Sequence, residues 1–476
     1  MKFVLQGLSN QILTDGQLTC SYKDLEVFFD SIQGFLASQQ ITTKVAIALE
    51  CENSLPVALV LLSLLEGDYS VLLLPRSKEP TTADSFQSDI PAFCHYKLVV
   101  ENAVTEIAEL ERPESWLKIT KNHGASAYKP DSDRPSLYMR TSGSTGKPKI
   151  TVHSHQNLLA NILNCVQRLK LTQEDRIAIP VPLYHMYGLG AAFLPGIAAG
   201  AGIDLQKSAN LLRYLQRERA FEPSVAFMTP IFCETLNKGR RSARPYRLTV
   251  TAGDRLRPNT LTAYESRFGC LVQLYGSTEM GAIAAGSPDD PQEIRAATVG
   301  KPMNNVQMRL QSDETIPEEM KDVGKLWCQH QYGFEGYIDE SGNDIPLNDD
   351  QGWFSTKDLG KIISDGEIEV LGRFDFSINR DGLLVFFSDV EKVVNTIAGV
   401  ESAIVVSGAE GARGKELVAY CILESGSENT DTELRAACFD LLPKRAVPDR
   451  LSIVKSFPLL PNGKIDRQEL IRIAKS

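Results

Sequence analysis

The first 150 residues alternate between two kinds of hydrophobic pattern. Apolar positions recur with helical spacing over Tyr22–Ser38, and they fill the helix-like run Pro56–Leu65. Two short β-rich runs, Val45–Leu49 and Val71–Leu74, flank the second of these helices. Because such alternation is typical of parallel strands joined by crossover helices, it predicts an α/β layer architecture.

The alternation continues after residue 150, and it predicts further helices and strands at His155–Leu169, Arg176–Val181, Leu248–Thr251, Pro258–Phe268 and Leu271–Leu274. Glu367–Leu371 resembles the last strand of this large part, and shorter elements typical of a small α+β unit follow from Val400. We therefore expect two domains, a large N-terminal one at residues 1–371 and a small C-terminal one at 372–476.

Composition narrows the class of protein. A chain of 476 residues with 43% hydrophobic and 23% charged residues is typical of a globular protein with two or three units. The net charge of -10 argues against nucleic acid as the principal partner. Nine cysteines without any CxxC spacing indicate reduced thiols in a cytoplasmic protein. We see no secretory signal over Met1–Leu13 and no clean membrane span.

The segment that most clearly suggests chemistry is a glycine- and hydroxyl-rich loop that consists of Thr141, Ser142, Gly143, Ser144, Thr145, Gly146, Lys147, Pro148 and Lys149. It follows the apolar stretch Ser136–Met139, which predicts a strand that ends at a sheet edge. The glycines let the backbone approach a ligand closely, the four hydroxyls donate hydrogen bonds, and the lysines supply positive charge. Successive backbone N–H groups in such a loop form an anion-binding concavity, so the loop predicts binding of a phosphate chain.

Two other interpretations of this loop compete with that prediction. The P-loop pattern requires a glycine, four residues, and then Gly-Lys followed by Ser or Thr. Thr141 stands where the first glycine should be, and Pro148 follows Lys147, so the pattern fails at two places. A solvated linker has a similar composition, and this stretch by itself does not exclude it.

Other segments carry single residues suited to chemistry. Tyr275 offers a flat face for a base, Thr278 a hydroxyl, and Glu279 a hard oxygen for Mg²⁺. His185 lies among aromatic residues, where a histidine is more often a core residue than a ligand. Lys464 lies in a Pro-Asn-Gly turn, where a lysine is normally just solvated. A core residue remains the alternative for His185, and ordinary turn or surface residues remain the alternative for the others.

Seven segments together resemble, in the same order, the motifs of the acyl-adenylate-forming superfamily, which contains acyl- and aryl-CoA synthetases, peptide-synthetase adenylation domains and luciferases. The segments are Thr141–Lys149, Val181–Leu189, Thr251–Leu256, Leu274–Gly281, Gly352–Gly360, Gly372–Glu391 and Leu460–Leu470. One such match is weak evidence, but seven collinear matches over nearly the whole chain are highly specific.

The resemblance implies roles for individual residues. The 141–149 loop would hold the ATP phosphates, Glu279 would bind Mg²⁺, and Lys464 would bridge the substrate carboxylate and the α-phosphate. His185 would orient the carboxylate, and Thr278 would contact the α-phosphate or the carboxylate. The remaining expected nucleotide-binding residues are Gly253, Asp254, Tyr275 and Gly276 in the adenine motifs, and Asp358 and Arg373 at the ribose, with Asp375 as the hinge of a mobile C-terminal lid.

The implied reaction is ATP-dependent activation of a carboxylic acid to an acyl-adenylate, followed by transfer to the pantetheine thiol of coenzyme A or of a carrier protein. No acidic residue lies between Val181 and Leu189, which favours a fatty or aryl acid over an amino acid. An amino-acid-activating enzyme, transfer to an amine, and an inactive nucleotide-binding protein remain the alternatives. The basic run Lys238–Arg244 could meet the phosphates of coenzyme A or an acidic carrier protein, and a solvated loop is the alternative. Lys357 and Asn379 stand where the superfamily usually has Gly and Lys.

Overall fold

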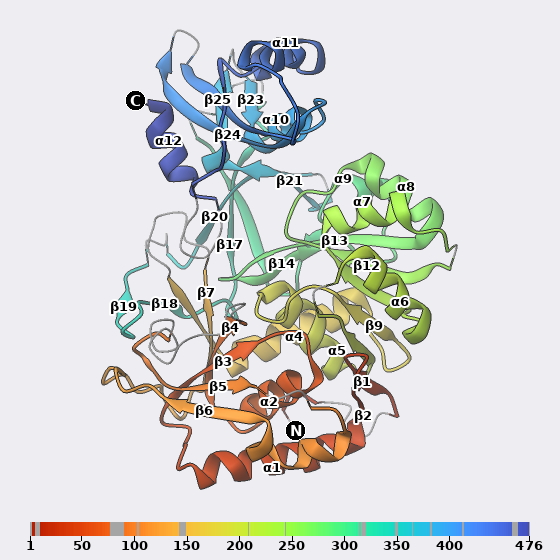
Figure 1. Ribbon diagram of the computed structural model, residues 1–476, viewed down its shortest axis with the longest axis vertical. Helices are drawn as coiled ribbons and strands as arrows, with labels where there is room; N and C mark the ends of the chain where they lie inside the picture. Colours follow the sequence, from red (N-terminus) through yellow and green to blue (C-terminus); the bar gives the residue numbers. More distant parts are fainter. Residues whose placement is uncertain are drawn as a thin grey trace. The chain divides into compact units, whose positions relative to one another are not determined.

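A computed structural model describes residues 2–4, 10–76, 90–101, 104–141, 149–207, 209–242, 244–313, 316, 320–347, 351–363, 365–380, 383–411, 414–458 and 465–475. The chain separates into two compact units, drawn in Figure 1. The first unit contains Met1–Gln307, Gln329–Gly352 and Ser364–Ile368, and the second contains Met308–Cys328, Trp353–Ile363 and Glu369–Ser476. The boundary that we expected after residue 371 falls inside strand β21, Ile368–Arg373.

The first unit is built on two large sheets. One has nine strands in the order β15 (Lys301–Pro302), β14 (Gly281–Ala285), β13 (Gly269–Ser277), β12 (Tyr246–Thr251), β11 (Val225–Met228), β9 (Arg176–Ile179), β10 (Gly202–Leu205), β1 (Ile12–Thr14) and β2 (Thr19–Ser21). The other has eight strands in the order β19 (Asp344–Ile345), β18 (Gly336–Ile338), β8 (Ile150–Ser154), β7 (Ser136–Arg140), β4 (Ser70–Pro75), β3 (Ala46–Cys51), β5 (Cys94–Val100) and β6 (Leu117–Lys121).

Both sheets are parallel at their centres, as the alternating pattern predicts. In the nine-stranded sheet β10, β9, β11, β12 and β13 pair in parallel, and in the eight-stranded sheet β5, β3, β4 and β7 do. The strands are buried on both faces because helices cover them. The helices of this unit are α1 (Leu25–Ser38), α2 (Leu55–Glu66), α4 (His155–Leu169), α5 (Leu194–Ala198), α6 (Leu211–Phe221), α7 (Pro230–Gly239), α8 (Pro258–Phe268) and α9 (Gln292–Ala297), with a π-helix at Tyr187–Phe193 and 3₁₀ turns at Tyr22–Asp24, Ile107–Glu111 and Pro113–Ser115.

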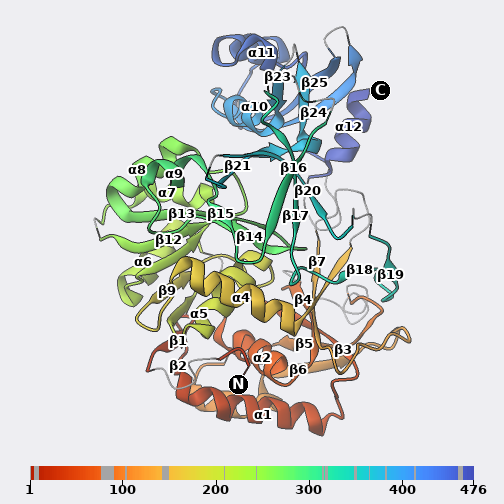
Figure 2. The same ribbon diagram turned by 180° about the vertical axis from the view of Figure 1, so that it is seen from behind.

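Helix α4 has a special position in this unit. It begins directly after β8, where the side chain of Ser154 accepts a hydrogen bond from the backbone N–H of Asn157 as an N-cap. The helix packs against β7 and β8 of one sheet and against β14 of the other. Figure 2 shows α4 from behind. The strand that follows the 141–149 loop is therefore joined rigidly to an element that contacts both sheets.

The second unit combines three small sheets. One has the order β16 (Gln307–Gln311), β17 (Gly324–Gln329), β20 (Phe354–Ile362) and β21, and a hairpin consists of β22 (Ser377–Arg380) and β23 (Leu383–Phe386). The third sheet contains β24 (Val400–Gly411), β25 (Gly414–Leu423) and β26 (Arg450–Ile453). Helices α10 (Phe387–Val394), α11 (Asp431–Leu441) and α12 (Arg467–Lys475) accompany it, with 3₁₀ turns at Phe374–Phe376 and Lys444–Ala446.

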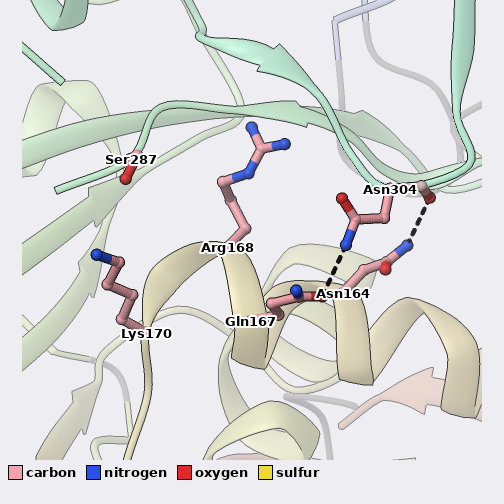
Figure 3. Close-up of a pocket in the computed structure, with 6 residues that line it drawn as sticks. All are labelled: Asn164, Gln167, Arg168, Lys170, Ser287 and Asn304. Atoms are coloured by element: carbon pink, nitrogen blue, oxygen red, sulfur yellow. Dashed lines mark hydrogen bonds between the residues drawn. The ribbon is translucent and has the colours of Figure 1, made fainter. Parts of the chain in front are cut away.

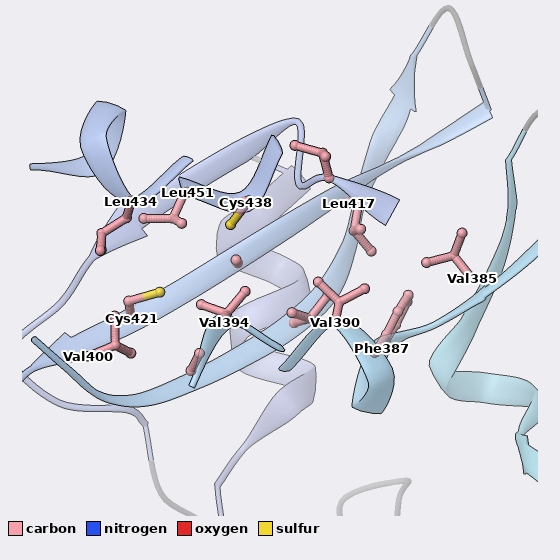
Figure 4. Packing of buried hydrophobic residues seen from close by; sticks show 14 of the residues in the cluster. Val385, Phe387, Val390, Val394, Val400, Leu417, Cys421, Leu434, Cys438 and Leu451 are labelled. Carbon is pink, nitrogen blue, oxygen red and sulfur yellow. The ribbon is translucent and has the colours of Figure 1, made fainter. Parts of the chain in front are cut away.

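The second unit has its own apolar core, shown in Figure 4. Val390 and Val394 of α10 pack with Leu417 and Cys421 of β25 and with Leu434 of α11. A separate core with mixed helices and short strands is the signature of a small α+β unit. The α/β class with a small second α+β part is thus confirmed.

Candidate functional site

The two ends of the 141–149 loop are closed by strand pairing. Strands β7 and β8 pair antiparallel, and the backbone N–H and the hydroxyl of Thr141 donate to the carbonyl of Lys149 at 2.9 and 3.1 Å. The loop is therefore a hairpin connection, whereas a P-loop joins a strand directly to a helix. The predicted residues Ser142, Gly143, Ser144, Thr145, Gly146 and Lys147 lie outside the described residues.

The turn at residues 277–281, between β13 and β14, carries Thr278 and Glu279 and lies near Lys149. The hydroxyl of Tyr337 donates a hydrogen bond of 2.8 Å to Oε1 of Glu279. The Nζ atom of Lys149 lies 5.1 Å from the centroid of the Tyr337 ring, which is within cation–π range. Tyr337 thus joins the end of the predicted phosphate loop to the predicted Mg²⁺ ligand.

The environment of Tyr337 keeps its hydroxyl protonated. Burial, and then the negative charge of Glu279, raise the pKa of Tyr337 well above its usual value. A neutral phenol beside a carboxylate acts as a donor, so this hydrogen bond is charge-assisted. Sequence reasoning missed Tyr337, which lies on the short strand β18 and faces the site only because β18 pairs with β8.

His153 fixes the same turn from the other side. Its Nε2 atom lies 2.8 Å from the carbonyl oxygen of Thr278, and the side chain is buried. Burial lowers the pKa of His153 to about 4, partly opposed by the bond to Thr278. The neutral imidazole must therefore carry its proton on Nε2 to donate to this carbonyl.

Two glycines allow the strands on either side of this turn to approach. A Cβ atom on Gly276 would lie 2.2 Å from the carbonyl oxygen of Gly281. Gly281 itself has a φ of +62°, in the region that favours glycine. Tyr275, the predicted adenine contact, is half-buried on β13 opposite Ala284.

The other predicted residues of the first unit lie on exposed turns. His185 is exposed, its ring centroid lies 4.5 Å from that of Tyr184, and its carbonyl accepts from the N–H of Leu189 at 2.9 Å. Gly253 and Asp254 follow β12 and are exposed, with a φ of +96° at Gly253. Like Thr278, they follow strand ends, where open α/β sheets bind ligands.

The remaining predicted residues belong to the second unit. The Nε atom of Arg373 lies 3.7 Å from Oδ1 of Asp358, and its Nη1 donates to the carbonyl of Thr356 at 3.4 Å. Asp375 lies in the 3₁₀ turn at Phe374–Phe376, with Arg373 Nη2 at 4.0 Å from its carboxylate. Lys464 lies outside the described residues.

Comparison with known proteins decides the family. The model of the AMP-binding enzyme family matches residues 9–338, and the model of the AMP-binding enzyme C-terminal domain matches residues 389–464. The chain belongs to the AMP-binding enzyme family. This confirms the predicted superfamily and the prediction that the chain is an enzyme.

Individual relatives of this AMP-binding enzyme include CoA ligases and a gramicidin synthase. It is 27% identical over 348 residues to the sulfoacetate–CoA ligase of Cupriavidus necator, a match that covers 72% of this chain and 68% of the relative. It is 29% identical over 376 residues to one component of the linear gramicidin synthase of Brevibacillus parabrevis, covering 75% of this chain and 7% of the relative. Three other curated relatives are matched over only 56–63% of their own length.

Among solved structures, the o-succinylbenzoate CoA synthetase of Bacillus subtilis in complex with its acyl-adenylate intermediate has a TM-score of 0.78 to this enzyme. The identity is 20%, and the alignment covers 98% of this chain and 97% of that one. At this level of identity the likeness establishes the shared fold.

Lys357 of the enzyme adopts a backbone conformation that explains why glycine is usual at this position. Its φ is +62° within β20, where the register between β17 and β20 shifts. Such a bulge re-aims the next side chain, here that of Asp358. Lysine in this left-handed region is strained, whereas glycine is not.

The basic run at residues 238–244 is largely exposed, as expected of a solvated loop, but Arg240 within it is buried. Arg240 is only 1% exposed and forms an ion pair of 2.5 Å with Glu218, while its guanidinium lies over the rings of Tyr246 and Phe268. Arg240 is therefore unavailable to a phosphate or a carrier protein.

Membrane-spanning helices and clusters of metal-ligating side chains are both absent from the described residues. The helices there are all too short or too polar to cross a membrane. Within the same residues, no group of three or more His, Cys, Asp or Glu side chains is placed to hold a metal ion.

Proposed function

We propose that this enzyme uses ATP to convert a carboxylic acid, most readily a fatty or aryl acid, into an acyl-adenylate and pyrophosphate. The observation that supports this most directly is the contact series from Lys149 through Tyr337 to Glu279. It brings a cation at the end of the 141–149 loop and an ionisable oxygen ligand to the same place, which is what a triphosphate with its metal ion requires.

The proposed chemistry depends on charge neutralisation. The carboxylate attacks the α-phosphate, so two anions must approach each other, and positioning and electrostatics dominate the catalysis. Lys149 and the backbone amides of the loop would neutralise the phosphates, and Glu279 would hold Mg²⁺, which supplies further positive charge. One protein carboxylate is sufficient because Mg²⁺ at phosphates is usually held by one or two, together with phosphate oxygens and water.

The other assignments follow the superfamily motifs and are part of the proposal. His185 and Thr278 orient the carboxylate and the α-phosphate. Gly253, Asp254, Tyr275 and Gly276 bind the adenine side, and Asp358 and Arg373 bind the ribose. Lys464 bridges the two reacting anions, and Asp375 is the hinge that allows the C-terminal region to move between the half-reactions.

For the second half-reaction we propose coenzyme A as the acceptor, because relatives such as the sulfoacetate enzyme are CoA ligases. A carrier protein is the second candidate, favoured by the likeness to a gramicidin synthase. Incubating the purified enzyme and ATP with coenzyme A, a phosphopantetheinylated carrier protein, or hydroxylamine as an amine separates these acceptors. The proposal of coenzyme A fails if a thioester forms only on the carrier protein.

The first half-reaction is tested by exchange of radiolabelled pyrophosphate into ATP. The panel contains octanoate, 4-coumarate, anthranilate, oxalate, sulfoacetate and several amino acids, each with Mg²⁺. We expect exchange to depend on an organic acid and to be fastest with a fatty or aryl acid. Absence of exchange with every acid would contradict the proposed function, and exchange with amino acids alone would support amino-acid activation.

Lys464 provides a sharper test of the same step. Replacing Lys464→Ala should lower the exchange rate by roughly two or three orders of magnitude, because an electrostatic contact to the transition state is lost. Binding of ATP, measured by calorimetry, should persist. The matched control is Lys455→Ala, which removes an exposed lysine of the same region. A Lys464→Ala variant as fast as the control would remove Lys464 from the mechanism.

A further inference from the structure

One face of helix α4 carries a stripe of polar side chains, and each of them forms a hydrogen bond with the backbone of another segment. Asn157, Asn161, Asn164 and Arg168 are spaced by four, three and four residues, which places them on one face. Asn157 Nδ2 donates to the carbonyl of Gly333 at 2.9 Å, and Asn164 Nδ2 donates to that of Asn304 at 3.1 Å.

The last turn of the stripe continues the pattern. The guanidinium of Arg168 donates to the carbonyls of Ala285, Lys301 and Pro302. Figure 3 shows this end of the helix, where a pocket of about 160 Å³ lies among Asn164, Gln167, Arg168, Lys170, Ser287 and Asn304. Here the stripe contacts β14, β15 and the loop after it, away from the turn that carries Glu279.

Asn161 differs from the rest of the stripe because it connects two segments that both adjoin the site. Its side chain is only 4% exposed. Its Nδ2 donates to the carbonyl of Gly190 in the π-helix at 2.8 Å, and its Oδ1 accepts from the N–H of Ala282 on β14 at 2.9 Å. The π-helix begins two residues after His185, and Ala282 follows Glu279 by three residues.

Two glycines pack closely against the side-chain amide of Asn161. A Cβ atom on Gly281 would lie 2.6 Å from Oδ1 of Asn161, and one on Gly190 would lie 3.2 Å from Nδ2. π-Helical turns are rare and occur mostly at functional sites. A buried amide that satisfies a donor on one segment and an acceptor on the other fixes the spacing between them, since either group would be costly to leave unpaired.

We propose that Asn161 is a positioning residue for the carboxylic-acid half of the site. It acts by holding the segment that follows His185 at a set distance from the segment that follows Glu279. This inference rests on the proposed function, in which His185 orients the carboxylate. Most of the residues proposed to bind the nucleotide lie on other segments, whereas the segment that follows His185 bonds directly to Asn161. Loss of Asn161 should therefore weaken use of the acid far more than use of ATP.

The test is steady-state pyrophosphate exchange by the full chain, with the best acid of the panel varied at saturating ATP and then ATP varied at saturating acid. Asn161→Leu should raise the KM for the acid by about tenfold or more, because it leaves both backbone partners unpaired. The KM for ATP should stay within about twofold, and the ranking of the panel acids should change.

Asn164→Leu is the matched control, since it removes the same kind of side chain from the same stripe one turn further on. We expect it to leave both KM values near wild type, and thermal unfolding of both variants shows whether a lost fold explains any difference. If Asn161→Leu does not fold, Asn161→Asp replaces it. That variant keeps an acceptor for the N–H of Ala282 but sets a carboxylate against the carbonyl of Gly190. Its KM for the acid, relative to wild type, should therefore decrease as pH falls from 8 to 6.

The inference is overturned if the variant at Asn161 keeps a wild-type KM for the acid, or if the KM values for acid and ATP rise equally. It is also overturned if Asn164→Leu produces the same acid-specific effect. Failure of the proposed function gives a distinguishable result, because the wild-type enzyme would then support no exchange with any acid, and the inference would fall with it.

Discussion

At the scale of single residues, the site depends on side chains whose state is set by burial. Tyr337 is held as a neutral donor beside Glu279, and His153 is held as a neutral donor to the carbonyl of Thr278. Both donors point at the 277–281 turn, so the orientation of Glu279 is determined by groups more than 50 residues away along the chain. Such preorganisation limits the movement that a metal ligand would otherwise have.

Tyr337→Phe tests this arrangement. Removing the hydroxyl leaves Glu279 without its charge-assisted hydrogen bond, which is worth about 1.5–3 kcal/mol. We expect the exchange rate at limiting Mg²⁺ to fall by about tenfold, with a smaller loss at saturating Mg²⁺.

The control for Tyr337→Phe is Tyr128→Phe, which removes a hydroxyl paired with Tyr138 at 2.8 Å in the same unit. It should leave the Mg²⁺ dependence unchanged. If Tyr337→Phe and the control show the same Mg²⁺ dependence, Tyr337 does not support the proposed metal ligand.

Lys357 allows a prediction about stability. Its left-handed conformation costs roughly 1–2 kcal/mol for a non-glycine residue. Glycine would remove that strain and lose about 0.4–1 kcal/mol through the entropy of the unfolded chain. Lys357→Gly should therefore stabilise the protein by about 0.5–1 kcal/mol, measured as a higher urea midpoint.

Lys361→Gly, in the same strand β20, is the matched comparison because Lys361 has no positive φ. It should destabilise the protein by about 0.5–1 kcal/mol. A decrease in stability for Lys357→Gly as well would show that the strain at Lys357 is compensated by its contacts.

At the scale of elements, buried polar groups join helices to each other and to the sheets. The stripe on α4 connects that helix to the π-helix and to β14. In the same way, the ion pair of Arg240 with Glu218 joins the end of α7 to α6, with Tyr246 also donating to Glu218. The basic run that looked like a solvated loop is therefore in part a structural connection.

Arg240→Met tests this interpretation. It removes the ion-pair partner of the buried Glu218 carboxylate and leaves only the hydrogen bond from Tyr246, and loss of one partner of a buried ion pair typically costs about 3–5 kcal/mol. We expect a large drop in the urea midpoint at neutral pH, while the KM for coenzyme A in the folded protein stays unchanged. The control, Arg241→Met, removes an exposed charge of the same run and should change stability by less than about 0.5 kcal/mol. A rise in the KM for coenzyme A with unchanged stability would indicate instead that Arg240 binds coenzyme A.

At the scale of the whole molecule, two buried histidines, His153 and His155, and the half-buried His330 make stability depend on pH. Burial lowers the pKa values of His153, His155 and His330 to about 4. In the unfolded chain the pKa of histidine is about 6.5, so the unfolded state binds more protons between these values. Their contribution to stability is therefore complete above pH 6.5 and is lost as pH falls towards 4.

We expect the free energy of unfolding, measured by urea at pH 7.5, 6 and 5, to change little above pH 6.5 and to fall as the pH decreases from 6.5 to 5. His153→Gln keeps a donor for the carbonyl of Thr278 but cannot titrate. The free energy of unfolding should therefore change less with pH in this variant than in the wild type. A slope unchanged in that variant would mean that His153 is not held neutral in the folded protein.

Much of the architecture could be predicted from local patterns. The helix at His155–Leu169 and the helix at Pro258–Phe268 have the predicted bounds. The signals that define them, which are the apolar spacing, the N-cap before the first helix and the proline that begins the second, involve residues only a few positions apart. The predicted strand at Leu271–Leu274 is longer in the structure, Gly269–Ser277, because pairing with β12 and β14 extends it beyond its apolar centre. The motifs that identified the superfamily are likewise contiguous stretches.

The residues that support those motifs could be recognised only in the folded protein. The order of residues alone determined the α/β class, the position of the 141–149 loop after a strand, and the family. It could not indicate Tyr337 or Asn161, because each is an ordinary polar residue until long-range pairing brings β18 beside β8 and α4 beside β14. Periodicity and turn chemistry are local and can be read along the chain, whereas hydrogen bonds between distant segments exist only after the sheets have assembled.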